Sequence, residues 1–283
     1  TTLPAGRQAT TYKMPELPEV ETMKRDLAQH IQGLRIKDVF VFDDRVLKDI
    51  SAKSFARKLK GTKIKALSRR GKAILFTLDP KLYIVVQVKM TGFFVYGEKS
   101  GSRDTKVIFQ LSNGKYLNYN DQRLFGWFHV VKDLQKVKYL QTIGPEPLTS
   151  DFQPQWLRQH LKRRTSPIKT LLMNQHFVAG IGNIYASEIL FSSKINPKKR
   201  ANRLTHKEIQ NLHQSTVTIL DEAIKYRGTS MRNYRDSKGE KGNFMNRIKV
   251  YGRDKESCLE CGTSITRIVQ AGRSTFYCKR CQK

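Results

Sequence analysis

Residues 14–22 read Met-Pro-Glu-Leu-Pro-Glu-Val-Glu-Thr, and they open the part of the chain that we expect to fold. Pro15 suits the first turn of a helix, where its missing N–H leaves no hydrogen bond unmade, and the acids that follow favour the positive end of a helix. Apolar residues then recur at helical spacing and predict an amphipathic helix over residues 16–31: Val20, Met23, Leu27 and Ile31.

Pro15 also has a chemical interpretation, because an initiator Met is usually trimmed before a small second residue. Removal of Met14 leaves the Pro15 nitrogen as a free secondary amine, with Glu16, Glu19 and Glu21 close in sequence. An α-amino group titrates at roughly 7.7–8.0, whereas a lysine titrates at about 10.4, so the terminal amine is more often unprotonated at neutral pH. Such an amine can attack an electrophilic carbon and form an iminium. Taken alone, the helix start is the commoner role for such a proline.

Residues 1–13 precede Met14 and lack the apolar core of a signal peptide. While they stay attached, the Pro15 nitrogen is a tertiary amide and cannot attack a carbon. We therefore expect residues 1–13 to be a non-native extension or a leader that is removed.

The composition indicates a partner that carries many negative charges. The 283 residues include 53 Lys and Arg against 24 Asp and Glu, a net charge of +29. Such a surplus on a folded chain is typical of nucleic-acid binding. No apolar run approaches the roughly 18 residues of a membrane-spanning helix, so we expect no membrane partner. The length suggests two domains, or two domains and a small module.

All four cysteines lie in the last 26 residues, as two Cys-x2-Cys pairs separated by sixteen residues. This spacing is typical of a four-thiolate zinc ribbon, in which two tight knuckles complete one tetrahedron. Disulfides are the alternative, but no secretion signal accompanies the cysteines. A site with four protein ligands leaves no position for a reactive water, so we expect one structural Zn²⁺. The ligands are Cys258, Cys261, Cys278 and Cys281.

Between residues 35 and 131, short runs rich in Val, Ile, Phe and Tyr alternate with turn signals such as Lys60-Gly61 and Asn113-Gly114. Many short strands joined by brief turns predict an antiparallel β-sandwich. The expected strands are residues 36–42, 63–67, 73–78, 82–88, 93–96, 106–111, 116–119 and 126–131.

Residues 144–147, Gly-Pro-Glu-Pro, read as a stiff linker, and beyond them the apolar period becomes helical. Thr205 followed by Glu208 is a capping box, which predicts the start of a long helix. The polar residues 235–247 contain two glycines and predict a flexible loop. The expected helices are residues 153–163, 167–174, 183–192, 205–226 and 229–234.

Residues 179–185 form a glycine turn that leads into a predicted helix, but the third glycine of a dinucleotide fingerprint is missing. Backbone N–H groups at a helix start can hold an anion, so a DNA phosphate bound there and at Asn183 is one interpretation. A helix corner capped by Asn183 is the alternative. Basic residues nearby favour a phosphate-tracking surface: Arg158, Lys162, Arg163, Arg164, Lys169, Lys194, Lys198, Lys199, Arg200 and Arg203.

Three further motifs each have a structural and a chemical interpretation. Lys72 follows Arg-Arg-Gly at a strand edge and can donate a proton or hold a phosphate, although a solvated edge is commoner. Arg123 and Phe125 share one face if the chain is extended, so they can enter a duplex or simply pack a strand. Arg273, between the zinc knuckles, can reach DNA or be a plain hairpin residue.

These motifs occur together in the order of one known family. The chain resembles formamidopyrimidine-DNA glycosylase, a bacterial-type 8-oxoguanine DNA glycosylase that is also an AP lyase. The resemblance runs from residue 14 to the C-terminus, and its first and fifth motifs are highly specific together. The motifs are residues 14–22, 69–72, 121–126, 144–148, 182–188, 250–253 and 273–278.

The resemblance implies catalytic roles for five residues. Pro15 corresponds to the Schiff-base nucleophile that attacks C1′ of the damaged nucleotide, Glu16 to its acid/base partner, and Glu19 to a supporting carboxylate. Lys72 and Arg273 correspond to the proton donors of β- and δ-elimination, and both also resemble phosphate contacts.

The resemblance also implies five DNA contacts. Arg164 and Asn183 correspond to residues that bind the backbone of damaged double-stranded DNA. Met90, Arg123 and Phe125 correspond to residues that fill the gap left by the flipped nucleotide. Flipping is required because the enzyme must reach C1′ and read the base outside the stack.

The implied fold class is α+β, in which an N-terminal antiparallel β-sandwich with a flanking helix precedes a helical domain with a helix–two-turn–helix and a terminal zinc ribbon. The expected domains are 14–147, 148–247 and 248–283, after the extension 1–13. Three residues depart from the family pattern: Lys89 stands for a glycine, Asp104 for a histidine and Leu124 for a second arginine. They bear on lesion preference more than on the class of reaction.

Several alternatives stay open on the sequence. Within the class, an endonuclease VIII-like glycosylase for oxidised pyrimidines is the near alternative. A non-catalytic DNA-binding protein follows if the leader is retained, and a basic zinc-ribbon protein that binds RNA is a third reading. We expect a monomer in the cytoplasm, associated with the nucleoid in a bacterium, with an organelle as the alternative location.

Overall fold

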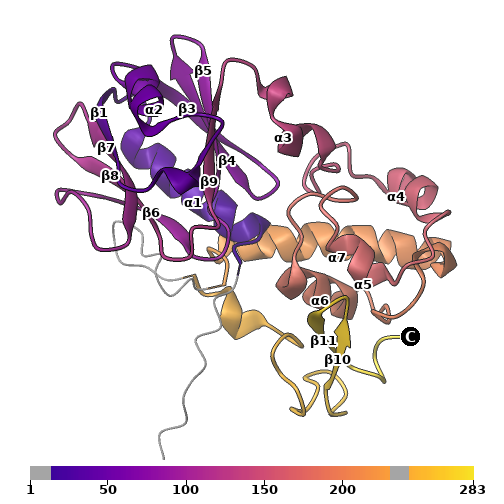
Figure 1. Ribbon diagram of the computed structural model, residues 1–283. Helices are drawn as coiled ribbons and strands as arrows, with labels where there is room; N and C mark the ends of the chain where they lie inside the picture. The colour runs from indigo at the N-terminus through magenta and orange to yellow at the C-terminus, as the bar shows by residue number, and fades with distance from the viewer. Residues whose placement is uncertain (1–13, 230–241) are drawn as a thin grey trace, which may run out of the picture.

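A computed structural model describes residues 14–229 and 242–283 of the chain (Figure 1). A β-rich half and a helical half lie side by side, and a small ribbon lies beneath the helical half. The expected extension 1–13 lies outside the described residues, as do most of the expected 229–234 helix and residues 235–241 of the expected loop. Within the described ranges, no helix is long and apolar enough to cross a membrane.

The β-rich half is a sandwich of two sheets, with strand orders β1-β7-β8-β6 and β2-β9-β5-β4-β3. All pairs are antiparallel except the short parallel pair β2–β9. The predicted α+β class with an antiparallel sandwich is confirmed. The strands are β1 (Ile36–Val41), β2 (Leu47–Lys48), β3 (Lys63–Arg70), β4 (Ala73–Asp79), β5 (Leu82–Gln87), β6 (Gly92–Gly97), β7 (Thr105–Leu111), β8 (Tyr116–Asp121) and β9 (Trp127–Val131).

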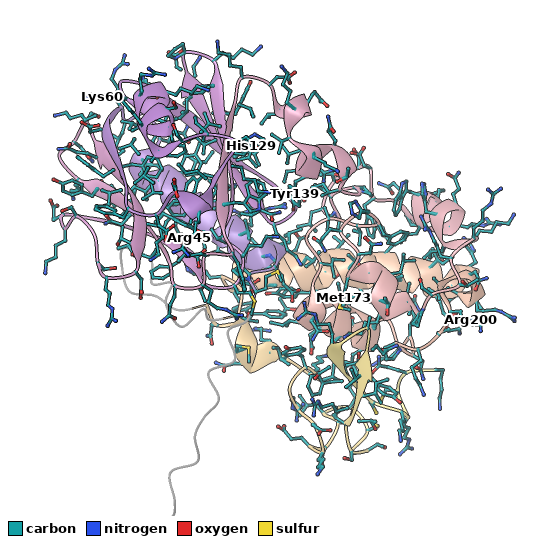
Figure 2. The ribbon with its side chains drawn as sticks, viewed as in Figure 1. Arg45, Lys60, His129, Tyr139, Met173 and Arg200 are labelled. Atoms are coloured by element: carbon teal, nitrogen blue, oxygen red, sulfur yellow. The ribbon has the colours of Figure 1, made fainter. Side chains whose placement is uncertain are left out.

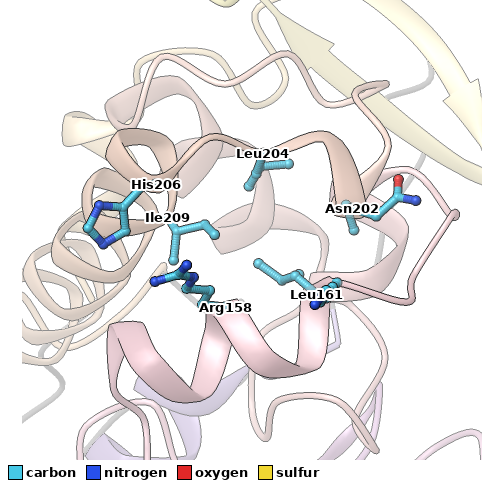
Figure 3. Close-up of a pocket in the computed structure, with 8 residues that line it drawn as sticks. Arg158, Leu161, Asn202, Leu204, His206 and Ile209 are labelled. Atoms are coloured by element: carbon cyan, nitrogen blue, oxygen red, sulfur yellow. The ribbon is translucent and has the colours of Figure 1, made fainter.

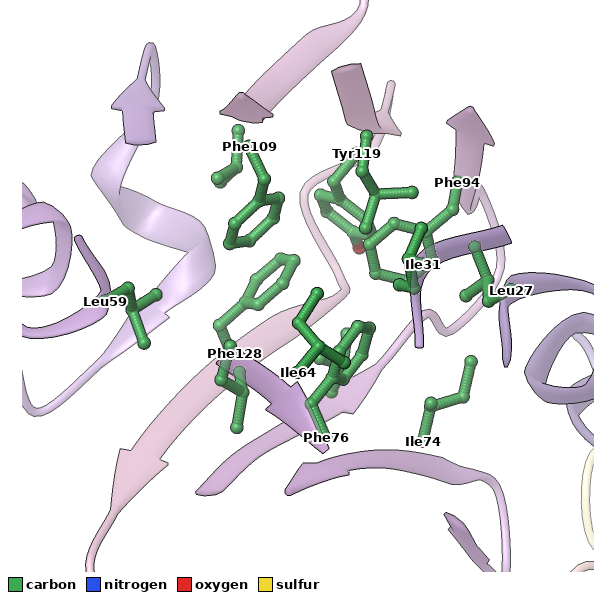
Figure 4. Close-up of a cluster of buried hydrophobic side chains, with 14 of the residues drawn as sticks. Leu27, Ile31, Leu59, Ile64, Ile74, Phe76, Phe94, Phe109, Tyr119 and Phe128 are labelled. Atoms are coloured by element: carbon green, nitrogen blue, oxygen red, sulfur yellow. The ribbon is translucent and has the colours of Figure 1, made fainter. Parts of the chain in front are cut away.

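An aromatic cluster fills the space between the two sheets (Figure 4). Phe128 of β9 lies at its centre, with the Tyr119 ring perpendicular to it at 4.7 Å between centroids and the Phe55 ring at 5.9 Å. Burying each such side chain contributes about 1.5–3 kcal/mol. Leu27 and Ile31 of α1 (Leu17–Ile31) close one side of the cluster, so the helix expected at 16–31 is part of the sandwich core.

Several short elements of this half were not predicted from the sequence, among them α2 (Ala52–Leu59), β2 and the 3-10 helix Asp44–Val46. Helix α2 begins at Ser51, whose side chain accepts a hydrogen bond from the Ser54 N–H, and only Phe55 and Leu59 of the helix are buried. Two apolar positions four residues apart are too few to establish a helical period. Strand β2 has only two residues.

Helix α3 (Lys138–Thr142) packs on the five-stranded sheet. The helical half contains α4 (Pro154–Leu161), α5 (Ile168–Leu172), α6 (Asn183–Ser192) and α7 (His206–Lys225). The Thr205 hydroxyl accepts from the Glu208 N–H and the Glu208 carboxylate accepts from the Thr205 N–H, so the predicted capping box is confirmed. Leu17 of α1 packs into the core of this half, and Arg227 forms an ion pair with Asp26 of α1 at 2.8 Å. Helix α1 therefore ties the two halves together.

The last segment is a hairpin of β10 (Thr266–Gln270) and β11 (Arg273–Tyr277) carried on its own small core. That core contains two of the cysteines and packs against Phe191 of α6. The hairpin thus has a fixed place beside α6.

Candidate active site

The carboxylate of Glu16 occupies the N-terminus of α6. It accepts hydrogen bonds from the N–H groups of Gly182 (2.7 Å), Ile184 (2.9 Å) and Tyr185 (3.3 Å). The Leu17 N–H donates to the Gly180 carbonyl at 3.0 Å, which holds the start of α1 against the glycine turn. Backbone N–H groups and the helix dipole make such a terminus a good anion site, and here the anion is a side chain of the protein.

This arrangement corrects one prediction for the glycine turn. The backbone N–H groups expected to hold a DNA phosphate donate instead to Glu16. Gly182 is the N-cap of α6 and Asn183 is its first helical residue, so Asn183 is not the cap either. A side chain at position 182 would place its Cβ 2.4 Å from the Glu16 carboxyl carbon, so a glycine is required there.

Burial raises the pKa of Glu16 from 4.5 to about 7. The Lys72 charge and the N–H donors of α6 act in the opposite direction, and the neighbouring Glu19 raises the pKa further. Desolvation disfavours the charged carboxylate more than these partners favour it. Glu16 can therefore both give and take a proton near neutral pH, as a general acid/base requires.

Glu19 accepts hydrogen bonds from three elements at once. Its carboxylate receives the Glu16 N–H at 3.0 Å, the Tyr185 hydroxyl at 2.6 Å, and both the N–H and the hydroxyl of Thr229 at 2.8 and 2.9 Å. It thereby fixes the backbone beside Pro15 and joins α1, α6 and the chain after α7. Pro15 itself is buried at this junction and, in the chain described here, follows Met14.

Lys72 lies in the turn between β3 and β4, and its ammonium donates to the Ile181 carbonyl at 3.1 Å. Its backbone N–H donates to the Tyr139 hydroxyl, which lies between the two halves of the molecule (Figure 2). Burial lowers the pKa of Lys72, while the charges of Glu16 and Glu19 oppose this effect. The sequence motif at this turn is therefore a half-buried part of the Glu16 cluster and not a solvated edge.

Lys169 was predicted to belong to a basic DNA-binding surface, and this prediction is wrong. Its side chain is buried, and its ammonium donates to the Asn183 side-chain oxygen, the Ser274 carbonyl (3.1 Å) and the Thr275 hydroxyl (2.9 Å). Burial lowers its pKa to about 8. Lys169 therefore links the first residue of α6 to the ribbon hairpin.

The side chains of Met90, Arg123 and Phe125 come together, although they lie in two loops. The Arg123 guanidinium lies 3.6 Å from the Met90 sulfur and 4.6 Å from the centre of the Phe125 ring. Arg123 and Phe125 belong to the loop between β8 and β9, where Leu124 has a φ of 56°, and not to an extended strand. Phe125 is 49% exposed, which is unusual for such a large apolar side chain.

Asp121 joins these two loops, and the sequence motif gave it no role. Its fully buried carboxylate accepts from the Thr91 hydroxyl, from the Arg123 N–H at 3.2 Å and from the Gly126 N–H at 2.8 Å.

Glu188 of α6 is a second residue without a predicted role. It accepts from three consecutive N–H groups, those of Lys249, Val250 and Tyr251, at 2.8–3.0 Å.

The two remaining predicted site residues are exposed. Arg273 begins β11, and its charge lowers the pKa of both Lys72 and Lys169, which places it near the Glu16 cluster. Arg164 lies after α4, where its carbonyl accepts from the Asn202 N–H at 2.8 Å. Within the described residues the Arg164 side chain makes no ion pair or hydrogen bond.

A hollow of about 300 Å³ lies between α4 and the start of α7 (Figure 3). Leu161 and Ile209 form part of its floor, and Arg158 and His206 lie at its rim. Arg158 and Lys162 of the predicted phosphate-tracking surface line it, but none of the five residues with an implied catalytic role does, so this hollow is separate from the Glu16 cluster.

The four cysteine sulfurs lie within 4.8 Å of one another, and no pair is bonded as a disulfide. The Cys261 and Cys278 sulfurs are 3.4 Å apart and those of Cys258 and Cys281 are 4.0 Å apart. Tetrahedral zinc with Zn–S bonds of about 2.3 Å requires sulfurs about 3.8 Å apart, so the site fits one Zn²⁺. The predicted structural zinc site is confirmed.

Three family profiles match the chain in sequence order. Residues 14–128 match the formamidopyrimidine-DNA glycosylase N-terminal domain, residues 143–235 its H2TH domain, and residues 255–283 the zinc finger found in FPG and IleRS. The formamidopyrimidine-DNA glycosylase of Desulforamulus reducens is 40% identical over 275 residues, which cover 95% of this chain and 99% of that protein.

The chain belongs to the formamidopyrimidine-DNA glycosylase family. The Chloroflexus aurantiacus formamidopyrimidine-DNA glycosylase is 42% identical over 272 residues, which cover 95% of this chain and 98% of that one. The resemblance to this family and the implied fold are thus confirmed.

Solved structures of the family have the same fold. A Lactococcus lactis FPG variant bound to DNA that contains Fapy-dG matches with a TM-score of 0.89 at 34% identity, covering 95% of this chain and all of that one. Lactococcus lactis Fpg bound to DNA with an abasic site matches equally well, with 99% of its chain covered. The Thermus thermophilus FPG protein has a TM-score of 0.85 at 34% identity, with 95% and 98% of the two chains covered.

Proposed function

We propose that this protein removes oxidised purines such as 8-oxoguanine and formamidopyrimidines from double-stranded DNA, and cleaves the abasic site through a Schiff base on Pro15. Its family is one of DNA glycosylases with AP lyase activity that act in base-excision repair. The observation that carries the assignment of residues is the Glu16 carboxylate, which is held beside Pro15 and has a pKa of about 7.

The reaction begins when the Pro15 nitrogen attacks C1′ of the flipped nucleotide. The N–C1′ bond forms, the glycosidic bond breaks, and the base leaves with the bonding pair and takes up the proton that the Pro15 nitrogen releases. Glu16 then gives its proton to the ring oxygen as the C1′–O4′ bond opens, which leaves an iminium between Pro15 and C1′. This chemistry requires that Pro15 be the first residue of the working enzyme, with Met14 and the preceding residues removed.

Strand cleavage follows from the iminium, which acidifies the proton on C2′. Loss of that proton expels the 3′ phosphate, and a second elimination expels the 5′ phosphate before water releases Pro15. Lys72 is the group that we assign to the first elimination and Arg273 to the second. Glu19 positions Glu16 and Pro15, since its carboxylate binds the Glu16 N–H.

DNA binding requires contacts on both halves of the molecule. Arg164 and Asn183 contact the strand backbone, and the exposed cluster of Met90, Arg123 and Phe125 fills the gap left by the flipped nucleotide. The Asp121 carboxylate holds the two loops that carry these side chains in place. Exposed apolar and cationic side chains on such fixed loops are suited to this role, because they can move from water into the duplex and stack on bases without a rearrangement of the loops. Zn²⁺ on the four cysteines supplies only structure, since it has no free ligand position.

Three further assignments belong to this proposal. The chain divides into a catalytic sandwich, residues 14–147, a helix–two-turn–helix domain, residues 148–247, and a zinc ribbon, residues 248–283, each with its own apolar cluster. The enzyme works as a monomer, because one site suffices for one lesion. Its location is the cytoplasm, on the nucleoid if the source is a bacterium, with an organelle as the alternative.

The proposal is tested by Pro15→Gly in a chain that begins at this position. The wild type should nick 8-oxoguanine duplex and give a covalent complex with borohydride, and Pro15→Gly should lose at least about 100-fold of the nicking rate. Undiminished nicking by the variant contradicts the assignment of the nucleophile. Faster cleavage of an oxidised pyrimidine than of 8-oxoguanine favours the endonuclease VIII-like alternative.

A further inference from the structure

A closed turn between β5 and β6 carries Lys89 next to Met90. The Gly92 N–H donates to the Val88 carbonyl at 2.9 Å, and Lys89, Met90 and Thr91 form the tip between them. The Thr91 hydroxyl is bound to the buried Asp121 carboxylate, which fixes the turn to the sandwich. Lys89 and Met90 therefore project from one rigid support.

Both the backbone and the amine of Lys89 are in energetically unfavourable positions in the DNA-free protein. Its φ is 52°, a left-handed conformation that costs a residue with a Cβ roughly 1–2 kcal/mol. Its side chain is half-buried, and burial lowers the pKa of its amine. Within the described residues the amine has no hydrogen-bond acceptor or acidic partner. Backbone strain of this kind is typical of sites that bind a ligand.

The nearest charges to Lys89 are other cations. The Lys48 charge repels the Lys89 charge. The Lys48 amine lies 4.4 Å above the ring of Trp127, a residue of β9 that pairs with Gln87 at the end of β5. Lys89 in turn lowers the pKa of the catalytic Lys72, as does Arg273. Lys72 also faces the carboxylates of Glu16 and Glu19, but the one charge that acts on Lys89 is the cation Lys48, so this end of the turn has the charge that a phosphate requires.

We propose that Lys89 binds a phosphate of the damaged strand beside the flipped nucleotide and so anchors Met90 in the gap. This inference rests on the proposed function, because it assumes that Met90 enters the duplex. The Cα atoms of Lys89 and Met90 are about 3.8 Å apart, and phosphates follow one another every 3.4 Å along the axis of one strand. A lysine next to the inserted residue is thus within reach of the adjacent phosphate.

The test is the salt dependence of binding to a duplex with a tetrahydrofuran abasic analogue, which has no base to remove. Lys89→Gly and Lys89→Asn both tolerate the left-handed backbone, so the fold is kept while the charge is lost. A plot of the logarithm of the association constant against the logarithm of the salt concentration has a negative slope. Each variant should make this slope shallower by about 0.9 and weaken binding roughly fivefold at about 0.15 M salt. Lys89→Arg should keep the wild-type slope.

The control is Lys58→Gln, which removes an exposed charge from α2 and should leave the slope unchanged. A wild-type slope in Lys89→Gly and Lys89→Asn overturns the inference, and so does a shallower slope in Lys89→Arg. Failure of the proposed function looks different, because the wild type itself then shows no preference for the lesion duplex and no cleavage of 8-oxoguanine DNA.

Discussion

At the scale of single residues, Glu16 decides whether the site can work near neutral pH. Burial raises its pKa to about 7, so the carboxyl is mostly protonated at pH 6 and mostly ionised at pH 8. Because the protonated form opens the sugar ring, formation of the iminium, and with it strand nicking, falls as the pH rises through about 7. Glu16→Gln should lose this limb of the pH profile and at least about 100-fold of the rate. A profile with the same limb in Glu16→Gln shows that another group titrates there.

Glu16 also affects stability, with a sign that follows from its raised pKa. Between pH 4.5 and about 7 the native state binds a proton that the unfolded state has lost, so this residue lowers the free energy of unfolding as the pH rises. Glu16→Gln should therefore gain stability over the wild type between pH 5 and pH 8, by at most about 3 kcal/mol. Urea unfolding at the two pH values measures the gain. An equal difference at both pH values contradicts the assigned pKa.

At the scale of elements, the N-terminus of α6 fixes the position of the Glu16 carboxylate. Gly182→Ala places a methyl group 2.4 Å from the Glu16 carboxyl carbon, so the carboxylate must move. Displacement of a catalytic group by about 1 Å can cost 100-fold in rate, and we expect a loss of that order with about 1–3 kcal/mol of stability. Gly97→Ala in β6 is the matched control, since its new Cβ meets nothing within 4 Å. Similar nicking rates in the two variants contradict this role of α6.

The elements that sequence periodicity predicted well are those with long apolar patterns. The α1 prediction ended at the observed residue, Ile31, and the capping box at Thr205 marked the start of α7. Helix α2 was missed because Phe55 and Leu59 are its only buried residues. Family resemblance indicated the roles of the site residues, which spacing alone left open.

The contacts that build the site could not be read from the sequence. Glu16 and Gly182 are far apart in the chain, and nothing local indicates that a carboxylate would take the place expected for a phosphate. Lys169 looked like one member of a basic cluster, yet burial turned it into a link between α6 and β11. Both errors came from judging a residue by its sequence neighbours when its spatial neighbours decide its role.

At the scale of the whole molecule, the zinc ribbon supports a site that lies mostly outside it. The hairpin carries Arg273, and its Ser274 and Thr275 bind the Lys169 ammonium beside α6. We expect one zinc per chain, and removal of the metal by a chelator should abolish strand cleavage. Added zinc should restore it, which is the control for chelator damage. Full activity in metal-free protein contradicts a supporting role for the ribbon.

The central claim of this account is that the Pro15 nitrogen, at the junction of the two halves, is the atom that bonds to DNA. The most direct measurement is borohydride trapping on 8-oxoguanine duplex, followed by mass spectrometry of the protein peptides. We predict a single adduct on the nitrogen of Pro15, in protein whose first residue is Pro15. An adduct on Lys72 or another lysine, or full nicking activity in protein that still carries Met14 and the residues before it, would contradict the account.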